Sequence, residues 1–407
     1  MAKEPPGCPP FDVSEWDNKT RGWQDRKPSL HVIPSAKLSK DDSLVSADAK
    51  ICIIFASANK IRKCKSCRTH FIDEFQMPES WWSDSSRKSN GYFGYHATDQ
   101  HTNTWAYFET KHLDGGDDYH WDKLNVFIRW NKSTHQTIVL SFDTPKTVVS
   151  RFKELLATPD PSTLKFPFWF YPHLLNELAR LQERAVWAVR DKVRAVEKKP
   201  PPEGRPKPDY RHLHDVARHA IHVSETLDVA AQTIERILRR HKDLMGSTPE
   251  DGQQAVHSEI QFFESFISSL RCRSASNDKR MANEIQLAFN TVAQHDASTS
   301  VQIGRATQSD SVTMKTIAFV TLAFLPPTFV SAIFSMSFFN YSAESGWAIS
   351  DKFWLYWAFA VPITVLTVIV WYCYLWQHNG SASPGDGKRR SQGSWYGGIR
   401  SFSLQII

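Results

Sequence analysis

Cysteine and histidine residues are the first candidates for chemistry in this 407-residue sequence. Cys64 and Cys67 are spaced like half of a zinc site, and His70 follows three residues after Cys67. A second Cys or His pair at the spacing of a zinc ribbon or finger is absent from the sequence. The pattern therefore favours an ordinary structural role over zinc binding.

A histidine-rich stretch at residues 212–222 is the second candidate. Its four histidines fall in one predicted helix, and the helical period places Asp215, His219 and His222 on a common face. Such a face can hold a metal ion, although most histidine clusters of this kind are solvated. No Ser, His and Asp arrangement is recognisable, so we do not expect an enzyme. A tail-anchored enzyme that uses this helix is the weakest alternative.

A double proline is the third candidate, because it frees backbone oxygens. Pro326 and Pro327 interrupt an apolar segment and remove two N–H donors, which leaves the carbonyl groups near Leu322 and Ala323 without helical partners. A freed carbonyl in lipid is costly unless protein or water satisfies it. Two interpretations of this helix kink stay open: a water-filled axis, or a kink packed against a neighbouring helix.

Two C-terminal segments lack charged side chains and are long enough to cross a bilayer. Residues 316–334 and 353–376 comprise 19 and 24 residues. At about 1.5 Å per residue they reach roughly 29 and 36 Å, against a hydrocarbon core of about 30 Å. We therefore predict two transmembrane helices, with a pair of buried core helices as the alternative. A purely soluble enzyme would expose too much apolar area.

The overall composition excludes two further classes of protein. Hydrophobic residues make up 41% of the chain, which can fill a substantial core, so disorder throughout is excluded. The 49 Lys and Arg against 43 Asp and Glu give a net charge of +6, too small a surplus for a dedicated nucleic-acid binder. The N-terminal residues resemble neither a secretory leader nor a transit peptide, so we expect most of the chain in the cytosol.

Periodicity and proline content divide the chain into segments. Short runs rich in β-branched residues at 51–55, 104–109, 125–130 and 136–142 predict strands, and a period of three to four residues over 167–199 predicts an amphipathic helix. The expected fold is an α+β membrane protein. The predicted segments are a flexible N-terminal arm (1–50), a cytosolic α/β domain (51–199), a Pro-rich connector (200–208), a cytosolic helical stalk region (209–315), transmembrane helix 1 (316–334), an outer loop (335–352), transmembrane helix 2 (353–376) and a flexible basic cytosolic tail (377–407).

A long stalk helix is predicted to run from about Gln253 into the first span and to end around Phe334. Its first part has apolar residues at a spacing of three to four, beginning with Ile260 and Phe263, which is typical of a packing seam. Residues 294–311 are rich in Ser, Thr and Gln, and a helix that is polar on most faces must be wet on most faces. A solvated stalk and a ring of such helices around an aqueous vestibule both fit this pattern.

Charge predicts the orientation of the spans. Lys and Arg lie before the first span and after the second, whereas the connecting loop has one lysine beside two acidic residues. The positive-inside bias therefore places both termini in the cytosol, and aromatic clusters at both ends of the second span are typical of membrane interfaces. The plasma membrane is the expected location.

Two helices per chain cannot enclose a pore, so conduction requires a ring of copies with one helix from each copy facing the axis. Neither span contains an acidic or basic residue. Such a lining suits a hydrated cation, and Mg²⁺ loses its waters reluctantly. No P-loop is present, which agrees with passive flux driven by the membrane potential.

The stretch MKTIAFVTLAFLPPTFVSAIFSMSF at residues 314–338 resembles the CorA-type magnesium transporters, a family that includes the ZntB-like zinc transporters. The positions in register with the family pattern are Met314, Lys315, Pro326, Thr328, Phe329, Phe334, Met336 and Phe338. The resemblance implies a homo-oligomer, expected to be a pentamer. It implies no cofactor beyond the transported cation, with Mg²⁺ as the first choice and Zn²⁺ or Co²⁺ as alternatives.

The family's Gly-Met-Asn signature at the outer selectivity mouth is altered here to Ser335, Met336 and Ser337. By register, Ser337 takes the place of the Asn that meets the hydrated cation. A ring of hydroxyl groups can still bond to ion-bound water, but it is wider and its oxygen dipoles are weaker. The resemblance therefore does not carry magnesium selectivity over to this mouth.

The resemblance also assigns five pore-lining positions along the first span. They are Ser311, Met314, Ile317, Leu325 and Thr328. Leu325, Ile317 and Met314 would form hydrophobic constrictions that gate by dewetting, and Thr328 would form a polar ring nearer the mouth.

The cytosolic magnesium sensor of the family uses acidic pairs between neighbouring subunits. One of the stalk positions concerned is Ser300 in this sequence, so that sensor is not carried over. Asp296 and Asp310 are nearby acidic candidates for cation sensing, with plain solvated charges as the alternative.

We therefore predict a passive, magnesium-like divalent cation transporter with an oligomeric pore. The alternative is a non-conducting relative in which the altered mouth at Ser335 and Ser337 has lost transport and the cytosolic domain acts as a membrane-anchored scaffold or sensor.

Overall fold

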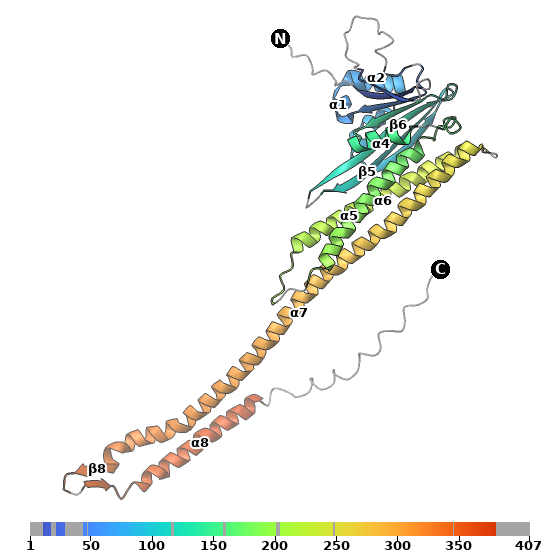
Figure 1. Cartoon of the computed structure of the whole chain (residues 1–407). Coiled ribbons are helices and arrows are strands. Elements are labelled where there is room, and N and C mark those ends of the chain that lie inside the picture. The colour runs from blue at the N-terminus through green and yellow to red at the C-terminus, as the bar shows by residue number, and fades with distance from the viewer. Residues whose placement is uncertain are drawn as a thin grey trace, which may run out of the picture. The chain divides into compact units, whose positions relative to one another are not determined.

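The protein consists of two compact units, Met1–Gln294 and His295–Ile407 (Figure 1). The computed structural model describes residues 11–17, 22–28, 44–46, 48–114, 118–157, 160–200, 204–246, 249–344 and 346–379. The predicted α+β class is confirmed, because a mixed sheet and long helices both contribute to the first unit.

A seven-stranded sheet forms the centre of the first unit, in the order β2-β1-β3-β7-β6-β5-β4. Strands β3 and β7 are parallel, whereas the other neighbouring pairs are antiparallel. The strands are β1 (Asp12–Asp17), β2 (Gly22–Arg26), β3 (Ile51–Ala56), β4 (Gly91–Ala97), β5 (His101–Leu113), β6 (Tyr119–Asn131) and β7 (Thr137–Phe142). The four strands predicted from β-branched runs are therefore confirmed as β3, β5, β6 and β7.

Strands β1 and β2 correct the prediction of a flexible arm over residues 1–50. β1 pairs with β3 in the interior of the sheet, and Val13 and Trp16 are buried. Between them lies Glu15, which is also buried and accepts hydrogen bonds from the side chains of Arg26 and Ser46. Because these partners compensate the charge of the carboxylate, Glu15 can occupy a strand of the core. Its polar side chain made this segment of the sequence resemble a loop.

Two hydrophobic cores cover the two faces of the sheet. Alternate residues of β3 point to opposite sides, so that Ile53 joins one core and Ile54 the other. On the Ile54 side lie α1 (Ala58–Lys63), α2 (Lys65–Phe75), a 3₁₀ helix (Glu79–Trp82) and α3 (Asp84–Lys88). On the Ile53 side lie α4 (Lys146–Leu155), α5 (Tyr171–Glu197), α6 (Tyr210–Leu244) and the first part of α7 (Asp251–Phe338).

Helix α6 belongs to the same core as the sheet, which differs from the prediction that 209–315 forms a separate helical stalk region. A Cβ atom at Gly91 of β4 would lie 2.7 Å from Val229 Cγ1, so α6 packs directly on the strand. Val223 and Leu227 are fully buried in the core that also contains Leu174 of α5. The connector at 200–208 therefore does not divide two domains. The prediction was wrong because helical period shows that a helix has an apolar stripe but does not show which surface that stripe covers.

The predicted long helix is confirmed as α7, whose residues up to Gln294 belong to the first unit. Ile260, Ile267 and Met281 of the predicted seam are buried in the shared core. From Ser298 to Val320 every side chain of α7 is exposed. The helix therefore changes from a packed to an exposed element, as its polar composition predicts.

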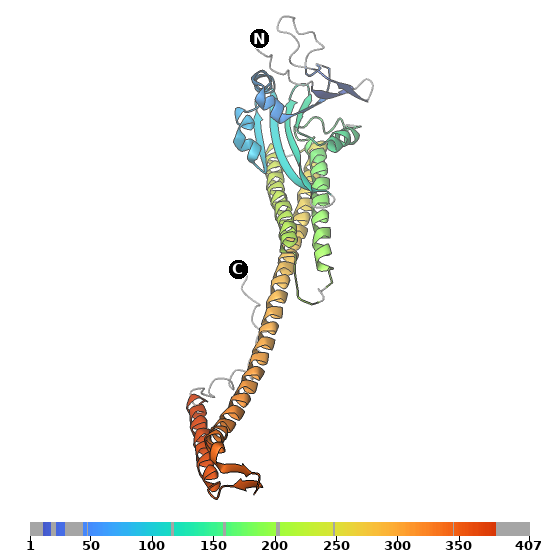
Figure 2. The same cartoon turned by 90° about the vertical axis from the view of Figure 1, so that its left-hand side faces the viewer.

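The second unit contains the rest of α7, the hairpin of β8 (Phe339–Ser342) and β9 (Gly346–Ile349), and α8 (Trp354–Asn379). α7 ends at Phe338, four residues beyond the predicted end of the first span, and the predicted outer loop at 335–352 is largely a hairpin. Figure 2 shows α8 running beside the C-terminal part of α7. The rings of Phe319 and Trp371, 5.1 Å apart, join the two helices.

A buried ion cluster supports the first unit and gives a stability prediction. The fully buried Glu177 accepts hydrogen bonds from Arg151 and Arg180 at 2.6 to 2.9 Å. Glu177→Ala should lower the free energy of unfolding by about 3 kcal/mol, at the low end for a broken buried pair because both arginines reach solvent.

Thermal unfolding of the purified full chain measures this loss as a fall in Tm. The matched control is Glu235→Ala, which breaks an exposed pair with Arg239 and should shift Tm far less. Equal shifts for the two variants would contradict the structural importance of Glu177.

Candidate functional site

The predicted pore-lining residues share one exposed face of α7. Met314, Ile317 and Leu325 are 71%, 61% and 61% exposed, and Ser311 and Thr328 are exposed as well. Their spacings place them within about a third of the helix circumference at roughly 100° per residue. The structure thus places all five side chains in one stripe, which α8 leaves uncovered.

Helix α8 packs on the opposite face of α7. Val330 on α7 is 4% exposed and Ala360 on α8 is 3% exposed, in helices whose other side chains are mostly exposed. The pair Phe319–Trp371 continues the same antiparallel contact towards the other end of the helices. Because α8 covers only this side, a single chain leaves the predicted lining open to its surroundings.

The double proline lies on the α8 side of α7 rather than on the exposed stripe. Pro326 is buried and follows Phe319 by seven residues, whereas Val330 follows Pro326 by four. These spacings place the three residues on one face. Helix α7 continues through both prolines to Phe338. Of the two interpretations of the proline site, packing against a neighbouring helix is therefore the one that the position of Pro326 favours.

Threonine hydroxyl groups supply polar atoms to the exposed stripe. Thr328 Oγ1 donates to the carbonyl oxygens of Phe324 and Leu325, both at 2.9 Å, and Thr321 Oγ1 donates to that of Ile317 at 2.9 Å. Because each hydroxyl hydrogen is bound to the backbone, the free lone pairs of the oxygen can accept hydrogen bonds from water. This is the polarity that the hydration shell of a cation requires.

Thr321 is a stripe residue that the sequence reasoning missed. It lies four residues after Ile317 and four before Leu325, and its side chain is exposed. The spacing could have identified it, because a hydroxyl group recurs at the same helical phase as Thr328. With Thr321 included, the stripe alternates apolar and hydroxyl side chains along the span.

The predicted mouth residues Ser335, Met336 and Ser337 lie in the final turns of α7, and their side chains fall outside what the structure describes. The β8–β9 hairpin follows directly. Its exposed aromatic residues Tyr341 and Trp347 are cross-strand partners whose rings lie 5.4 Å apart. An aromatic pair at the end of a span is typical of a membrane interface.

The acidic candidates for cation sensing are both exposed, and they do not meet within one chain. Asp296 lies 3.6 Å from the His295 side chain, and Asp310 is exposed on the same helix. Fourteen residues separate the two, or roughly 21 Å along an α-helix. Neither carboxylate therefore forms a cation site with the other in a single copy of the chain.

The two cysteines of the predicted half-site differ in burial. Cys67 is buried in the core on the Ile54 side of the sheet, while Cys64 is half-buried. His70 lies against the rings of Phe71 and Phe75. Within the described ranges, these three residues are not among the groups of side chains that could hold a metal ion.

The histidine-rich helix is α6, and its inner histidines pack against the β5–β6 hairpin. Lys111 Nζ lies 2.9 Å from His222 Nδ1, and the ring of His219 lies against that of Tyr119. Burial and the neighbouring Lys111 lower the pKa of His219 to about 4. An ammonium group in this position opposes a second cation, so the metal interpretation of Asp215, His219 and His222 receives no support.

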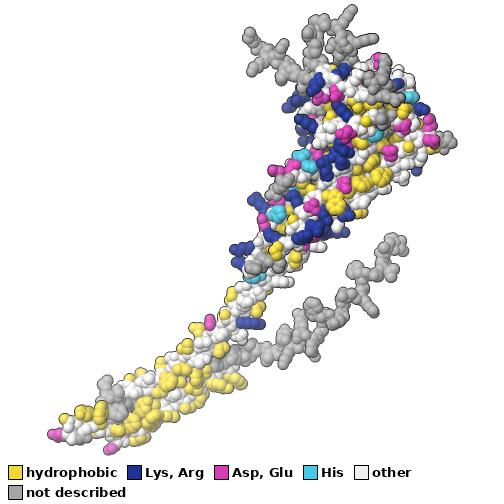
Figure 3. Space-filling view, viewed as in Figure 1, with side chains coloured by type: hydrophobic (Ala, Val, Ile, Leu, Met, Phe, Trp, Pro, Cys, Tyr) yellow, Lys and Arg dark blue, Asp and Glu magenta, His cyan; other side chains and the backbone are white. Residues whose placement is uncertain are grey.

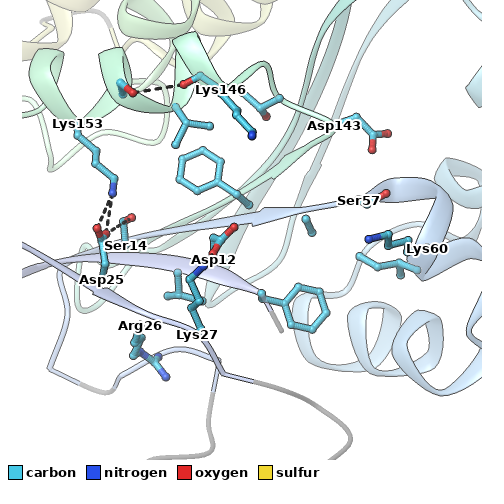
Figure 4. Close-up of a pocket in the computed structure, with 18 residues that line it drawn as sticks. Asp12, Ser14, Asp25, Arg26, Lys27, Ser57, Lys60, Asp143, Lys146 and Lys153 are labelled. Atoms are coloured by element: carbon cyan, nitrogen blue, oxygen red, sulfur yellow. Dashed lines mark hydrogen bonds and ion pairs between the residues drawn. The ribbon is translucent and has the colours of Figure 1, made fainter. Parts of the chain in front are cut away.

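A cavity of about 780 Å³, lined by both apolar and charged side chains, opens where the parallel strands β3 and β7 end (Figure 4). Lys153 Nζ contacts both carboxylate oxygens of Asp25 at 2.7 and 2.8 Å, and the backbone N–H of Ala58 donates to Asp143. The bonds from Lys153 and Ser14 lower the pKa of Asp25. The sequence did not indicate this cavity, because its lining comes from strands and helices far apart in the chain.

Apolar surface distinguishes the second unit from the first. Hydrophobic side chains cover most of the surface around α8, whereas charged side chains cover the sheet-containing unit (Figure 3). Two helices, Asp251–Ile333 within α7 and Trp354–Cys373 within α8, are long and apolar enough to cross a membrane, and their apolar windows are only 11% and 6% buried. Together these features define a class of protein with a folded α+β unit and two candidate membrane spans.

The chain belongs to the family described as CorA-like Mg2+ transporter protein, whose sequence model matches residues 122–377, more than half of the chain. The family consists of membrane-integral metal-ion transporters with two spans. Divalent metal transport is thus the general activity of the family. The resemblance to CorA-type transporters that the sequence indicated is confirmed.

One curated relative is notoamide biosynthesis cluster protein M' of Aspergillus versicolor. It is 34% identical over 290 residues, which cover 65% of this chain and 61% of the relative. The match therefore spans less than two thirds of the length of that protein.

The solved structures that resemble the chain loosely include the following three. The CorA magnesium transporter of Methanocaldococcus jannaschii is 13% identical, with 88% of this chain and 96% of that chain covered and a TM-score of 0.40. The full-length CmaX protein is 14% identical, with coverages of 92% and 98% and a TM-score of 0.40. The ZntB cytoplasmic domain of Vibrio parahaemolyticus is 8% identical, with coverages of 72% and 99% and a TM-score of 0.43.

Three histidines of the first unit, the buried His219 and His241 and the half-buried His173, give a prediction of pH dependence. Burial lowers the pKa of His173, His219 and His241 to about 4, from an ordinary value of 6.5. The unfolded chain therefore binds more protons than the folded chain below pH 6.5. Stability should be full above pH 6.5 and should fall as the pH drops towards about 4.

Tm measured as a function of pH checks this expectation. His241→Asn should flatten the slope between pH 6.5 and 4, because one of the three groups no longer titrates. His214→Asn, at an exposed position of α6, is the control and should keep the parental slope. A parental slope in His241→Asn would contradict the assignment.

Proposed function

We propose that several copies of this chain form a ring in which the exposed stripe of α7 lines a water-filled path for a divalent cation. The stripe consists of Ser311, Met314, Ile317, Thr321, Leu325 and Thr328. The observation that carries the proposal is that α8 packs on the other side of α7 and leaves this stripe open. In a family of metal-ion transporters, an open stripe with hydroxyl groups suits the lining of a path between subunits.

The chemistry of the stripe favours a cation that keeps its water. Residues 316–334 contain no acidic or basic side chain, so no charge replaces the hydration shell. Thr321 and Thr328 present oxygen lone pairs that accept hydrogen bonds from ion-bound water. Mg²⁺ is the cation that this arrangement suits best, because it is commonly bound through its waters. Zn²⁺ and Co²⁺ are the alternatives.

The membrane potential is the proposed driving force. An inside-negative potential contributes roughly 2.3 kcal/mol per charge per 100 mV, or about 4.6 kcal/mol for a divalent cation. Lys and Arg flank the spans on the side of the chain termini, so we place both termini in the cytosol and the β8–β9 hairpin outside. The proposed membrane is the plasma membrane, and the proposed ring is a pentamer.

The acidic side chains on the exposed part of α7 have a proposed role in this ring. Asp296 and Asp310 do not meet within one chain, but a ring brings equivalent carboxylates of neighbouring copies towards a common axis. There they would bind cytosolic cations and thereby report their concentration.

A non-conducting relative is the second candidate, and the residues at the mouth favour it. Ser335 and Ser337 stand where the family signature has Gly and Asn. If hydroxyl groups at this place do not retain the hydrated cation, the chain does not conduct and the first unit acts as a membrane-anchored scaffold or sensor. Flux through the parental protein separates the two candidates directly.

Leu325 tests the proposed lining. Cation uptake into liposomes that contain the pure protein should be above that of empty vesicles, and Leu325→Thr should raise it several-fold, because a polar side chain keeps a hydrophobic constriction wet. The control is Val320→Thr, an exposed position about 140° around the helix from Leu325, which should leave the flux unchanged. Equal flux in the parent and Leu325→Thr would contradict the lining.

The mouth is tested by the double substitution Ser335→Gly with Ser337→Asn, which rebuilds the family signature. We expect the parent to conduct and the double variant to favour Mg²⁺ over Co²⁺ more strongly, because an amide carbonyl has a larger dipole than a hydroxyl. Ser269→Asn, an exposed position of α7 in the first unit, is the control. A silent parent whose double variant conducts would instead establish the non-conducting candidate.

A further inference from the structure

Two histidines and an aspartate of the β5–β6 hairpin lie side by side on the sheet of the first unit. His112 on β5 is the direct partner of His120 on β6, and their ring centres are 4.7 Å apart. Asp122 lies two residues after His120, on the same face of β6. The hairpin register thus brings together three side chains that are typical ligands of a transition metal.

The ligand atoms of this His/Asp cluster, defined as His112, His120 and Asp122, all lie within 4.8 Å of one another. His120 Nε2 is 3.4 Å from Asp122 Oδ1. A tetrahedral Zn²⁺ with ligand bonds of about 2.0 to 2.2 Å holds its ligand atoms roughly 3.3 to 3.6 Å apart. Small side-chain rotations at the exposed His120 and half-buried His112 are therefore enough to close the cluster around an ion.

Asp114 fixes the orientation of the His120 ring. Its Oδ2 lies 2.9 Å from His120 Nδ1 and accepts the hydrogen bond from Nδ1–H, so that in the neutral ring Nε2 keeps its lone pair on the Asp122 side. A carboxylate bound to the second ring nitrogen is the common arrangement behind a metal-binding histidine. The orientation is therefore set before any ion binds.

The environment of the Asp122 carboxylate favours a bound cation. Its side chain is only 10% exposed, and within the described part of the chain its one ion-pair partner is His120, which carries a charge only when it is protonated. A nearly buried carboxylate is costly unless it is paired. With Asp114, the cluster supplies two negative charges and two imidazole rings, which matches the charge and the ligand preference of Zn²⁺.

We propose that His112, His120 and Asp122 bind a transition-metal dication, with Zn²⁺ as the best fit, and that Asp114 positions His120. Three protein ligands leave a fourth position for water. Imidazole nitrogens disfavour Mg²⁺, which prefers oxygen ligands, so this site differs in chemistry from the hydrated path along α7. The site belongs to the first unit and does not depend on the proposed conduction.

The competing explanation is a charge network in which a protonated His120 bridges Asp114 and Asp122 without a metal. The hydrogen bond with Asp114 does raise the pKa of His120. His112 Nε2 lies 3.7 Å from Asp114 Oδ1, so such a network can include His112 as well. Metal binding itself therefore separates the two explanations, because only a metal site binds the ion and loses affinity for it when His112 is removed.

Cobalt titration of the metal-stripped full chain in detergent tests the site. Tetrahedral Co²⁺ with imidazole ligands absorbs visible light strongly, whereas hydrated octahedral Co²⁺ absorbs weakly, so binding along α7 does not interfere. We expect one equivalent of strongly absorbing Co²⁺ per chain, displaced by Zn²⁺ but not by a large excess of Mg²⁺.

His112→Ala and His120→Ala should each lower the Co²⁺ affinity at least 10-fold, and Asp114→Asn should lower it about 10-fold through the orientation of His120. The matched control is His214→Ala, an exposed histidine of α6 outside the cluster, which should bind like the parent. Far-ultraviolet circular dichroism and Tm confirm that each variant is folded.

Absence of the strong absorption in the parent, or parental affinity in His112→Ala, would overturn the proposal. Zinc binding in a protein that shows no flux would still support the metal site while contradicting the proposed conduction. The two proposals can thus fail separately.

Discussion

The open stripe on α7 is the feature on which the functional interpretation depends. Two helices cannot surround water, and α8 covers only the side of α7 that contains Phe319, Pro326 and Val330. Hydroxyl groups at Thr321 and Thr328 lie on the uncovered side. Each of these hydroxyl groups is satisfied by its own helix backbone, so the stripe lines a water-filled path only in the proposed ring.

The double proline lies on the packed side of α7, although its freed carbonyl groups had also suggested a water-filled axis. Pro326 is buried, so the face that it interrupts is the face that packs. Thr328 Oγ1 donates to the carbonyls of Phe324 and Leu325 on the exposed side of the helix. The prolines therefore belong to the packed face, and the threonines supply the polar atoms of the stripe.

The first unit has a sheet with a hydrophobic core on each face. Strand pairing sets the positions of several of its polar groups. Glu15 and Glu177 are compensated by arginines and support the fold. His112, His120 and Asp122 form a cluster because two long strands pair in one register, and a shift by a single residue would move them to opposite faces. The same hairpin presents Lys111 to His222 on α6, where a metal ion is disfavoured.

The sequence by itself determined the properties that follow from local pattern. Charge-free runs of 19 and 24 residues identified the two spans, and spacings of three to four residues identified α5, α6 and the long α7. Tertiary structure decided what long-range contact controls. β1 is a core strand because Glu15 finds Arg26, α6 packs on the sheet rather than forming a separate stalk, and the His/Asp cluster exists only through hairpin register. The reason is physical: periodicity specifies which side of an element is apolar, whereas only the folded chain supplies the partner that compensates a buried charge or completes a set of ligands.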